Sequence, residues 1–332
     1  MLNSLFSTIL GEKMLSVVVD LGGTNIRFAV CDLETGKLSQ LEELVCADFS
    51  TLEEVLTQYF STLHSEVKNL CIGIACPVEG DQVTMTNLSW EFSQRTLKDK
   101  LNLNSLYVIN DYTAISLAVP FLSPEERIQI GGGEVESEGV IAVFGPGTGL
   151  GVSHIVKSAD KWVNLPGEGG HISFTANTRE QAEVLFLLQE LFGHVSAERI
   201  LSGQGLVNIY QSLCAVAKQT PKFELPKEVS KAGLDGSCDI ARRTMEVFCQ
   251  VMGSFAGNLA LNLNCTGGVY IAGGIVMRFI EFFQASEFRS FFEEKGRFKA
   301  QLSGIPTFLI TNTNPGLLGA TVYLRQELNM IK

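Results

Sequence analysis

The glycine turn near the start of the chain is the feature that most constrains its fold. A β-branched apolar run at residues 17–19 leads through Asp20 into a Gly-Gly-Thr-Asn turn at residues 22–25, and a second apolar run follows at once. This pattern predicts a hairpin of strand, tight turn and strand. The dinucleotide fingerprint and the P-loop place a helix after glycines at other spacings, so neither is present. Successive turn N–H groups suit phosphate oxygens and Asp20 suits a cation, although a simple hairpin turn is the alternative.

A second copy of this pattern favours the phosphate interpretation. Residues 140–155 again run from an apolar strand through a glycine turn with a threonine, at residues 147–149, into another strand. A third segment, residues 268–275, is a strand whose last glycines open a helical pattern, where a ligand can approach the backbone closely. The three segments predict a duplicated unit with one phosphate turn in each half, and a nucleotide held in a cleft between two lobes.

Composition limits the kinds of protein that this chain can be. Hydrophobic residues make up 45% and charged residues 18% of the 332 positions, which predicts a soluble globular chain with a substantial core. The formal net charge of -11 argues against nucleic acid as a partner, since that needs a basic face. No apolar run reaches the roughly 18 residues of a membrane span. Residues 1–13 are a poor signal peptide and are interpreted as an extension, so that Met14 begins the structured part.

Element order predicts how the chain is organised. A helical pattern at residues 52–60 is followed by buried strands at residues 71–75 and 106–109. Longer helical patterns lie at residues 181–192 and 245–262, and a last helix starts at about Leu317. Alternating strands and helices of this kind predict an α/β protein whose ligands sit beyond the carboxyl ends of its strands.

Polar residues at strand ends and in loops are the candidates for a substrate site. Asn110 and Asp111 end a strand, so they suit a hydroxyl-rich ligand, or they cap the following helix. Glu168 and His171 share a glycine-rich loop, which favours a hydroxyl-rich ligand and offers no second histidine or cysteine for a metal. Glu198, in the first turn of a short helix after Ser196, has an ordinary explanation in the helix dipole.

The ordered motifs resemble a known superfamily. Asp-x-Gly-Gly-Thr-Asn, then Gly-x-Gly-Thr-Gly, then Ala-Gly-Gly is similar to the nucleotide site of the sugar kinases, heat-shock ATPases and actin. The segments at residues 110–114, 166–171, 194–199 and 314–319 narrow the resemblance to the bacterial glucokinase family, from about Ser16 to the C-terminus. The resemblance implies a two-lobed actin-like ATPase (ribonuclease H-like) α/β fold. It places residues 14–111 plus 315–332 in a small domain and residues 112–314 in a large domain, with a cleft between them.

The resemblance also implies a function and assigns roles to residues of this sequence. The function is ATP-dependent phosphorylation of D-glucose to glucose 6-phosphate, by a cytoplasmic homodimer that uses Mg²⁺. Asp111 is implied as the general base. The implied glucose ligands are Asn110, Asp111, Glu168, His171 and Glu198. The implied nucleotide-site residues are Asp20, Gly22, Gly23, Thr24, Asn25, Gly147, Thr148, Gly149, Gly273 and Gly274. Asp20 is expected to reach Mg²⁺ through water, with no direct protein ligand to the metal.

Two alternatives to this function stay open from sequence. The first is a kinase for another hexose or an amino sugar. The second is a non-catalytic sugar-binding regulator, which the short stretch before the first strand argues against, because the regulators compared carry a DNA-binding module there. A related branch of repressors and kinases carries a cysteine-rich zinc loop. Here no cysteine follows His171 until Cys214, so we expect no structural zinc and eight reduced thiols.

Overall fold

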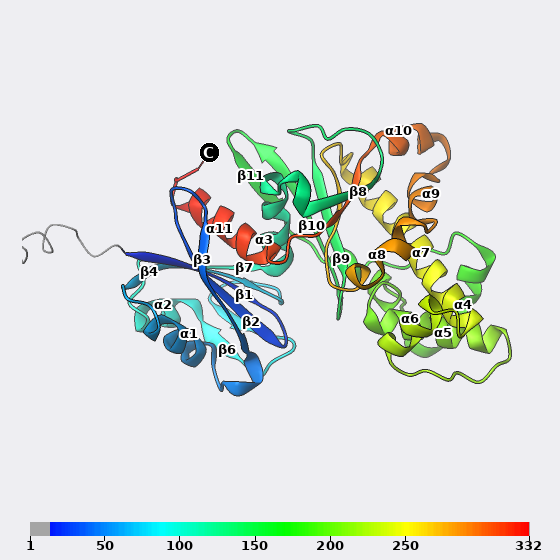
Figure 1. Ribbon diagram of the computed structural model, residues 1–332, viewed down its shortest axis with the longest axis horizontal. Helices are drawn as coiled ribbons and strands as arrows, with labels where there is room; N and C mark the ends of the chain where they lie inside the picture. The colour runs from blue at the N-terminus through cyan, green and yellow to red at the C-terminus, as the bar shows by residue number, and fades with distance from the viewer. Residues whose placement is uncertain (1–13, 332) are drawn as a thin grey trace, which may run out of the picture. The chain divides into compact units, whose positions relative to one another are not determined.

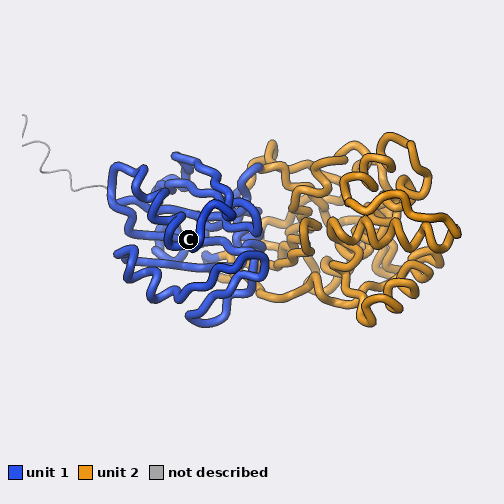
Figure 2. The backbone as a smooth tube through the Cα atoms, turned by 90° about the horizontal axis from the view of Figure 1, so that it is seen from below, with its two compact units in different colours: residues 1–121, 159–161, 313–332 blue, residues 122–158, 162–312 orange. Residues whose placement is uncertain are grey.

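The computed structural model describes residues 14–331, and the predicted extension at residues 1–13 lies outside the described residues. The chain divides into two compact units, which Figure 2 colours blue and orange. In the described range, unit 1 comprises residues 14–121, 159–161 and 313–331, and unit 2 comprises residues 122–158 and 162–312. Helix α3 (Asp111–Ala118) falls in unit 1, because it packs on the C-terminal helix α11 (Pro315–Glu327). The predicted domain ranges stay a prediction.

Unit 1 is built on a five-stranded sheet. Its strand order is β3 (Leu38–Val45), β2 (Asn25–Cys31), β1 (Leu15–Leu21), β4 (Val67–Ile74) and β7 (Ser105–Asn110). The pair β1–β2 is the predicted antiparallel hairpin, and β1, β4 and β7 run parallel. Strand β3 pairs antiparallel with β2. Strands β5 (Gln82–Thr84) and β6 (Glu91–Ser93) form a separate two-stranded antiparallel hairpin.

Helices cover both faces of this sheet. Because side chains alternate along a strand, Val17 and Val19 of β1 face one core and Val18 faces another. The first core includes α1 (Leu52–Ser61) and α2 (Gln94–Lys100), where the Tyr59 ring stacks on Phe28 at 4.5 Å. The second core includes α3 and α11, which lie side by side in Figure 1. Asp20 has the parity of Val18 and therefore belongs to the face that α11 covers.

Unit 2 is built on a six-stranded mixed sheet. Its strand order is β11 (Lys161–Leu165), β10 (Leu150–Ser158), β9 (Ile141–Pro146), β12 (Gly268–Ile271), β13 (Thr307–Ile310) and β8 (Arg127–Gly131). The antiparallel pair β9–β10 is the second predicted hairpin, while β12 runs parallel to β9. The helices are α4 (Arg179–Phe192), α5 (Gly203–Val216), α6 (Pro226–Leu234), α7 (Asp239–Leu263), α8 (Ile280–Gln284), α9 (Phe288–Glu293) and α10 (Lys299–Gly304).

The long buried helix α7 organises the core of unit 2. Phe248, Cys249, Met252 and Ala256 are fully buried in it, among apolar side chains from β9, β12, α5 and α9. Each fully buried Val, Leu or Phe stabilises such a core by about 1.5–3 kcal/mol. The eight cysteines are all free thiols, as predicted, and Cys238 alone among them is partly exposed. Within residues 14–331, every helix is too short or too polar to cross a membrane.

Candidate active site

The first glycine turn leaves two backbone donors without partners. Gly22 N–H donates to Asn25 O at 3.0 Å and closes the turn, and Cys46 N–H donates to Thr24 O at 2.8 Å. Among the described residues, the N–H groups of Gly23 and Thr24 have no acceptor. A β1–β2 turn with two successive free donors is suited to binding an anion. The side-chain amide of Asn25 is not free, because it donates to Glu43.

A partly buried carboxylate lies near the end of β1, before this turn. Asp20 is paired in register with Arg27 of β2, whose guanidinium lies 3.7 Å away. Arg27 also donates to Glu43 at 2.9 Å. Burial raises the pKa of Asp20 above its usual range, Arg27 opposes the shift, and Glu43 adds to it. The shortage of positive charge around this partly buried carboxylate favours a cation beside it.

Asp111 is a second candidate site carboxylate in unit 1. It is the first residue of α3, and it follows β7, which is hydrogen bonded to β4 next to β1. Burial, followed by the negative charge of Asp20, raises the pKa of the Asp111 carboxyl to about 7. Such a carboxyl is poised to take or give a proton near neutral pH, as a general base must be. Tyr112 N–H donates to its Oδ1 at 2.9 Å, which fixes the orientation of the carboxyl.

The helix cap at this position is Asn110, not Asp111. Its Oδ1 accepts hydrogen bonds from the N–H groups of Tyr112 and Thr113 at 2.9 and 3.3 Å, while its Nδ2 donates to Cys76 O at 3.4 Å. The capping explanation offered for Asp111 therefore applies to its neighbour, and Asp111 keeps the Tyr112 N–H bond and the weaker first-turn interaction with the helix dipole. Asn110 has its side-chain oxygen engaged by the backbone.

Two residues near these carboxylates escaped the sequence prediction of site residues. Gly316, in the first turn of α11, has no side chain, and a Cβ there would lie 2.7 Å from Cγ of Asp20. Asn87 packs against the first turn, since a Cβ on Gly23 would lie 3.0 Å from its Cβ. The Pro-Gly pair at the helix start was the available signal for Gly316, together with the parity of Asp20 in β1.

The second turn repeats the donor pattern in unit 2. Gly147 N–H donates to Gly149 O at 2.8 Å, and Gly203 N–H at the start of α5 donates to Gly147 O at 2.9 Å. In the part of the chain that the structure describes, the N–H groups of Thr148 and Gly149 have no acceptor. The next N–H, of Leu150, donates at 2.9 Å to a carboxylate, Oε2 of Glu198. Glu198 therefore has a role beyond the helix dipole.

The glycine loop is joined to the segment that carries Glu198. This segment is the 3-10 helix η5 (Ala197–Arg199), capped by Ser196 as expected. Ala197 N–H donates to Ile172 O at 2.8 Å, and a β-bridge joins Ser173 to Ser196. The loop also lies on β10, because a Cβ at Gly170 would be 2.1 Å from Leu150 O.

These contacts gather three of the predicted sugar ligands at one end of β10. Glu168 and His171 lie on the exposed side of the loop, around the 3-10 helix η4 (Gly169–His171). Glu198 comes from η5, whose chain is hydrogen bonded to the residue after His171. The structure thus brings Glu168, His171, Glu198 and the second turn together within unit 2, while Asn110 and Asp111 belong to unit 1.

The third predicted segment lies against the second turn. Gly273 follows β12 with a φ of +90°, and a Cβ there would be 2.7 Å from Pro146 O. A left-handed residue cannot begin a right-handed helix, so the glycines do not open a helix directly, as the sequence pattern had suggested. The next helical segment is the 3-10 helix η6 (Val276–Phe279). A Cβ at Gly274 would have nothing within 4 Å, which leaves room for a ligand beside the backbone.

The donors and carboxylates fit a nucleotide with its magnesium ion. Each unit, taken by itself, has a free N–H pair in its glycine turn that suits phosphate oxygens, and in unit 2 the open space at Gly274 suits the adenosine end. No group of three or more His, Cys, Asp or Glu side chains is placed to hold a metal within residues 14–331. Mg²⁺ does not need one, because it keeps several waters and binds through one or two carboxylates plus substrate phosphates. Asp20 and Asp111 can supply that share.

Comparison with known proteins agrees with this geometry. A family model described as Glucokinase matches residues 17–327. Glucokinase from Psychromonas ingrahamii is 50% identical over 318 residues, covering 96% of this chain and 99% of the relative. Glucokinase from Pectobacterium atrosepticum is 51% identical over 312 residues, covering 94% and 97%. The crystal structure of a glucokinase from an Antarctic psychrotroph, 34% identical, superposes with a TM-score of 0.86 over 94% of this chain and 99% of that one.

These matches extend through every segment that carries the resemblance, from the first turn to the last helix. They confirm the two-lobed actin-like α/β fold class predicted from the order of the motifs. Near-complete coverage at about 50% identity means that the site residues described above lie inside the matched region. The chain is therefore a member of the glucokinase family.

Proposed function

We propose that this member of the glucokinase family transfers the γ-phosphoryl group of ATP to the 6-hydroxyl of D-glucose, with Asp111 as the general base. The observation that carries this proposal is the position of Asp111 directly after a parallel strand, where burial and then the charge of Asp20 raise the pKa of its carboxyl to about 7. Phosphoryl transfer requires little covalent chemistry from a protein. It requires positioning, charge neutralisation and a group that accepts the proton of the attacking hydroxyl.

Asp111 is suited to the last of these tasks. In its ionised form it accepts the proton as the hydroxyl oxygen attacks, and its raised pKa increases its basicity. The Tyr112 N–H bond holds the carboxylate, and the Asn110 cap holds the first turn of α3. Bound Mg²⁺ supplies positive charge against the phosphate oxygens, and Asp20, through water, with Asp111 nearby, would hold it.

Unit 2 supplies ring and phosphate ligands in this proposal. Glu168, His171 and Glu198 bind ring hydroxyls, and Asn110 adds a contact from unit 1 through its Nδ2 group. The phosphates are bound by the backbone donors of both turns, Gly22-Gly23-Thr24-Asn25 and Gly147-Thr148-Gly149. Gly273 and Gly274 receive the adenosine end. The support for this assignment is the set of free donors and the clustering of Glu198 with the glycine loop.

The setting of the enzyme is part of the same proposal. We expect a cytoplasmic protein, in keeping with eight free cysteines. We also expect a homodimer. Neither nucleic acid nor a membrane is expected as a partner, given a net charge of -11 and no membrane-spanning helix among the described residues.

Substrate choice tests the proposal directly. A coupled assay with ATP and Mg²⁺ compares glucose with galactose, mannose and N-acetylglucosamine. An epimer leaves a buried polar group unpaired, which costs about 1–3 kcal/mol, so glucose should exceed galactose in kcat/KM by at least about tenfold. Equal turnover of both sugars contradicts the glucose assignment. Sugar binding by calorimetry without turnover of any sugar points to a regulator instead.

A further inference from the structure

Three charged side chains form a row across β1, β2 and β3 of unit 1, beside the first glycine turn. Asp20 of β1 lies opposite Arg27 of β2, and Arg27 lies opposite Glu43 of the edge strand β3. Residues directly opposite each other in antiparallel strands project from the same face of a sheet, so all three side chains share one face. One guanidinium therefore lies between two carboxylates, and the way it divides between them sets the charge at each end.

The guanidinium of Arg27 is bound more closely by Glu43 than by Asp20. Its Nε donates to Oε2 of Glu43 at 2.9 Å, whereas its Nη1 lies 3.7 Å from Oδ2 of Asp20. The first contact is a charge-assisted hydrogen bond, and the second is too long to be one. The bond from Arg27 holds the pKa of Glu43 below its usual range, whereas burial keeps the pKa of Asp20 raised despite the charge of Arg27. The positive charge of this row is thus committed mainly to Glu43.

The second oxygen of Glu43 reaches the turn itself. Oε1 of Glu43 accepts a hydrogen bond from Nδ2 of Asn25, the residue that ends the turn and begins β2. Asn25 and Arg27 are two positions apart in β2, so their side chains project from the same face of the sheet. One carboxylate on the neighbouring strand thus holds both a residue of the turn and the partner of Asp20. Glu43 lies outside the Gly-Gly-Thr-Asn motif, and no sequence motif singled it out.

We propose that Glu43 is a positioning residue for the cation, which holds the Arg27 guanidinium away from Asp20 so that this carboxylate stays available to a hydrated Mg²⁺ ion. The inference rests on the function proposed above, in which Asp20 reaches Mg²⁺ through water. Two carboxylates and one guanidinium leave the row net negative, which attracts a cation. With Glu43 neutralised, Asp20 and Arg27 together are neutral, and the guanidinium is released to form a direct pair with Asp20 that competes with the hydrated ion.

An ordinary ion pair on the surface of a sheet is the competing explanation. The side chain of Glu43 is 47% exposed and that of Arg27 is 38% exposed, and pairs with such exposure contribute little to stability. A surface pair affects only the stability of the fold, whereas a positioning residue affects how strongly Mg²⁺ promotes nucleotide binding. The arrangement favours the second explanation, because the other contact of Arg27 is Asp20 and the other contact of Glu43 is the turn.

Neutralising Glu43 tests this role without turnover. The probe is AMP-PNP, a non-hydrolysable analogue of ATP, which is titrated by calorimetry into the whole chain saturated with glucose, once with Mg²⁺ and once with EDTA. Glu43→Gln keeps an oxygen that can accept from Asn25 but removes the charge that holds Arg27. The variant should bind AMP-PNP with Mg²⁺ about three- to tenfold more weakly than the wild type, and its binding in EDTA should change by less than about twofold.

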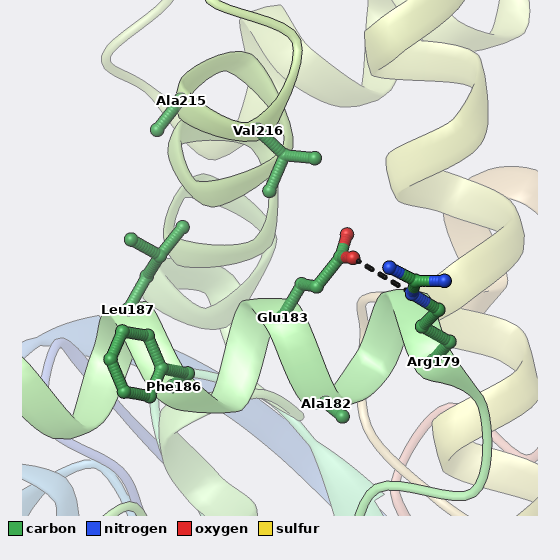
Figure 3. A pocket seen from close by; sticks show the side chains of 7 residues that line it. All are labelled: Arg179, Ala182, Glu183, Phe186, Leu187, Ala215 and Val216. Carbon is green, nitrogen blue, oxygen red and sulfur yellow. Dashed lines mark ion pairs between the residues drawn. The ribbon is translucent and has the colours of Figure 1, made fainter.

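Two control variants separate this effect from the loss of a charge and from the loss of an ion pair. Glu42→Gln removes the same charge one residue away, but Glu42 lies opposite Phe28 and projects from the other face of the sheet. Glu183→Gln breaks a comparable pair in unit 2, where Nε of Arg179 lies 3.4 Å from Oε1 of Glu183 on α4, at the edge of the hollow in Figure 3. The Glu183 side chain is 41% exposed, close to the 47% of Glu43. Neither control should change AMP-PNP binding with Mg²⁺.

A double variant shows whether Glu43 acts through Arg27. In Arg27→Gln there is no guanidinium to hold, so adding Glu43→Gln should change AMP-PNP binding with Mg²⁺ by less than about twofold. Wild-type binding by Glu43→Gln, or an undiminished loss in the Arg27→Gln background, overturns this inference alone. A wild type whose AMP-PNP binding does not depend on Mg²⁺ overturns the proposed cation site and this inference together, so the two failures are distinguishable.

Discussion

The first glycine turn, residues 22–25, and the second, residues 147–149, present the same kind of free donors but are supported by different neighbours. Each closes on the N–H of its first glycine and leaves the next two N–H groups without acceptors among the described residues. The first turn adjoins Asp20, and burial, followed by the charge of that carboxylate, raises the pKa of Asp111. The second turn is bonded through Leu150 N–H to Glu198. We infer that the first turn belongs with the proton and the cation, and the second with the sugar.

The largest expected effect on activity comes from changing Asp111, the carboxylate associated with the first turn. Asp111→Asn should fold and bind glucose nearly as well as the wild type, but lose about 10²–10⁴ in kcat, since asparagine cannot accept the proton. The capping hypothesis expects almost no change, and the structure gives the cap to Asn110. Steady-state kinetics and thermal denaturation of this one variant separate the two. Activity within about threefold of wild type removes Asp111 from the mechanism.

The same carboxyl sets a pH dependence. Because the base must be ionised, kcat/KM of the wild type should fall as pH drops through about 7, the pKa of Asp111 in the free chain. The residual activity of Asp111→Asn should not show this fall in kcat/KM as the pH drops through about 7. A wild-type profile that is flat between pH 6 and 8 contradicts the assignment.

The second turn is tested by a matched pair of glycines. A Cβ at Gly149 would lie 2.5 Å from Oε2 of Glu198, the mobile end of a side chain, so Gly149→Ala should fold and displace that carboxylate. A Cβ at Gly147 meets nothing closer than 3.9 Å, so Gly147→Ala disturbs no neighbour in the chain.

The two variants should differ in which substrate they affect. Gly149→Ala should raise KM for both glucose and ATP, lowering kcat/KM by roughly ten- to a hundredfold, because a charged hydrogen bond is worth about 1.5–3 kcal/mol. Gly147→Ala should raise KM for ATP alone. Steady-state kinetics with each substrate varied measures both, and unchanged glucose KM in Gly149→Ala breaks the link between the second turn and the sugar.

The sequence predicted much of this arrangement, for identifiable reasons. Both hairpins were predictable because β-branched runs on either side of a glycine turn allow few other folds. Helices α4 and α7 were predictable from apolar spacing, although both begin earlier than expected, α7 by six residues at Asp239. The expected helix after Gly273 failed because its positive φ depends on contact with Pro146, which no local pattern reveals.

Long-range contacts were beyond sequence reasoning alone. The hydrogen bond from Leu150 N–H to Glu198 joins residues 48 positions apart, and the local sequence of neither segment predicts it. The Asp20–Gly316 approach joins the two ends of the chain. Asn110 illustrates a smaller limit, because an amide at a strand end fits both a sugar and a cap until the backbone geometry is known. The roles of the site residues stay predictions.

Changing Gly316, which lies against Asp20 near the first turn, should have a smaller effect on activity. A Cβ there would lie 2.7–3.0 Å from all three atoms of the Asp20 carboxylate group, so Gly316→Ala should shift that group while keeping α11. The Mg²⁺ concentration for half-maximal activity should rise about three- to tenfold, with glucose KM unchanged. Gly304→Ala is the control, because a Cβ at this glycine of α10 meets nothing within 4 Å. An unchanged Mg²⁺ requirement separates Asp20 from the cation.

The smallest expected effect is on the free energy of unfolding of the metal-free chain, through the ionisation of Asp111. The folded pKa of Asp111, about 7, lies above its ordinary value of 3.8, so the folded state binds this proton more tightly than the unfolded state. The stabilising proton is therefore present below about pH 4 and is lost as pH rises through about 7. Asp111→Asn removes the buried charge, and in EDTA at pH 8 it should exceed the wild type by on the order of 1–2 kcal/mol, a few degrees in Tm. The difference should close toward pH 5. If the variant is less stable than wild type at pH 8, then Asp111 is ionised there at no cost, as a simple first-turn carboxylate would be. That result would contradict the assignment of a proton-accepting carboxylate to the neighbourhood of the first turn.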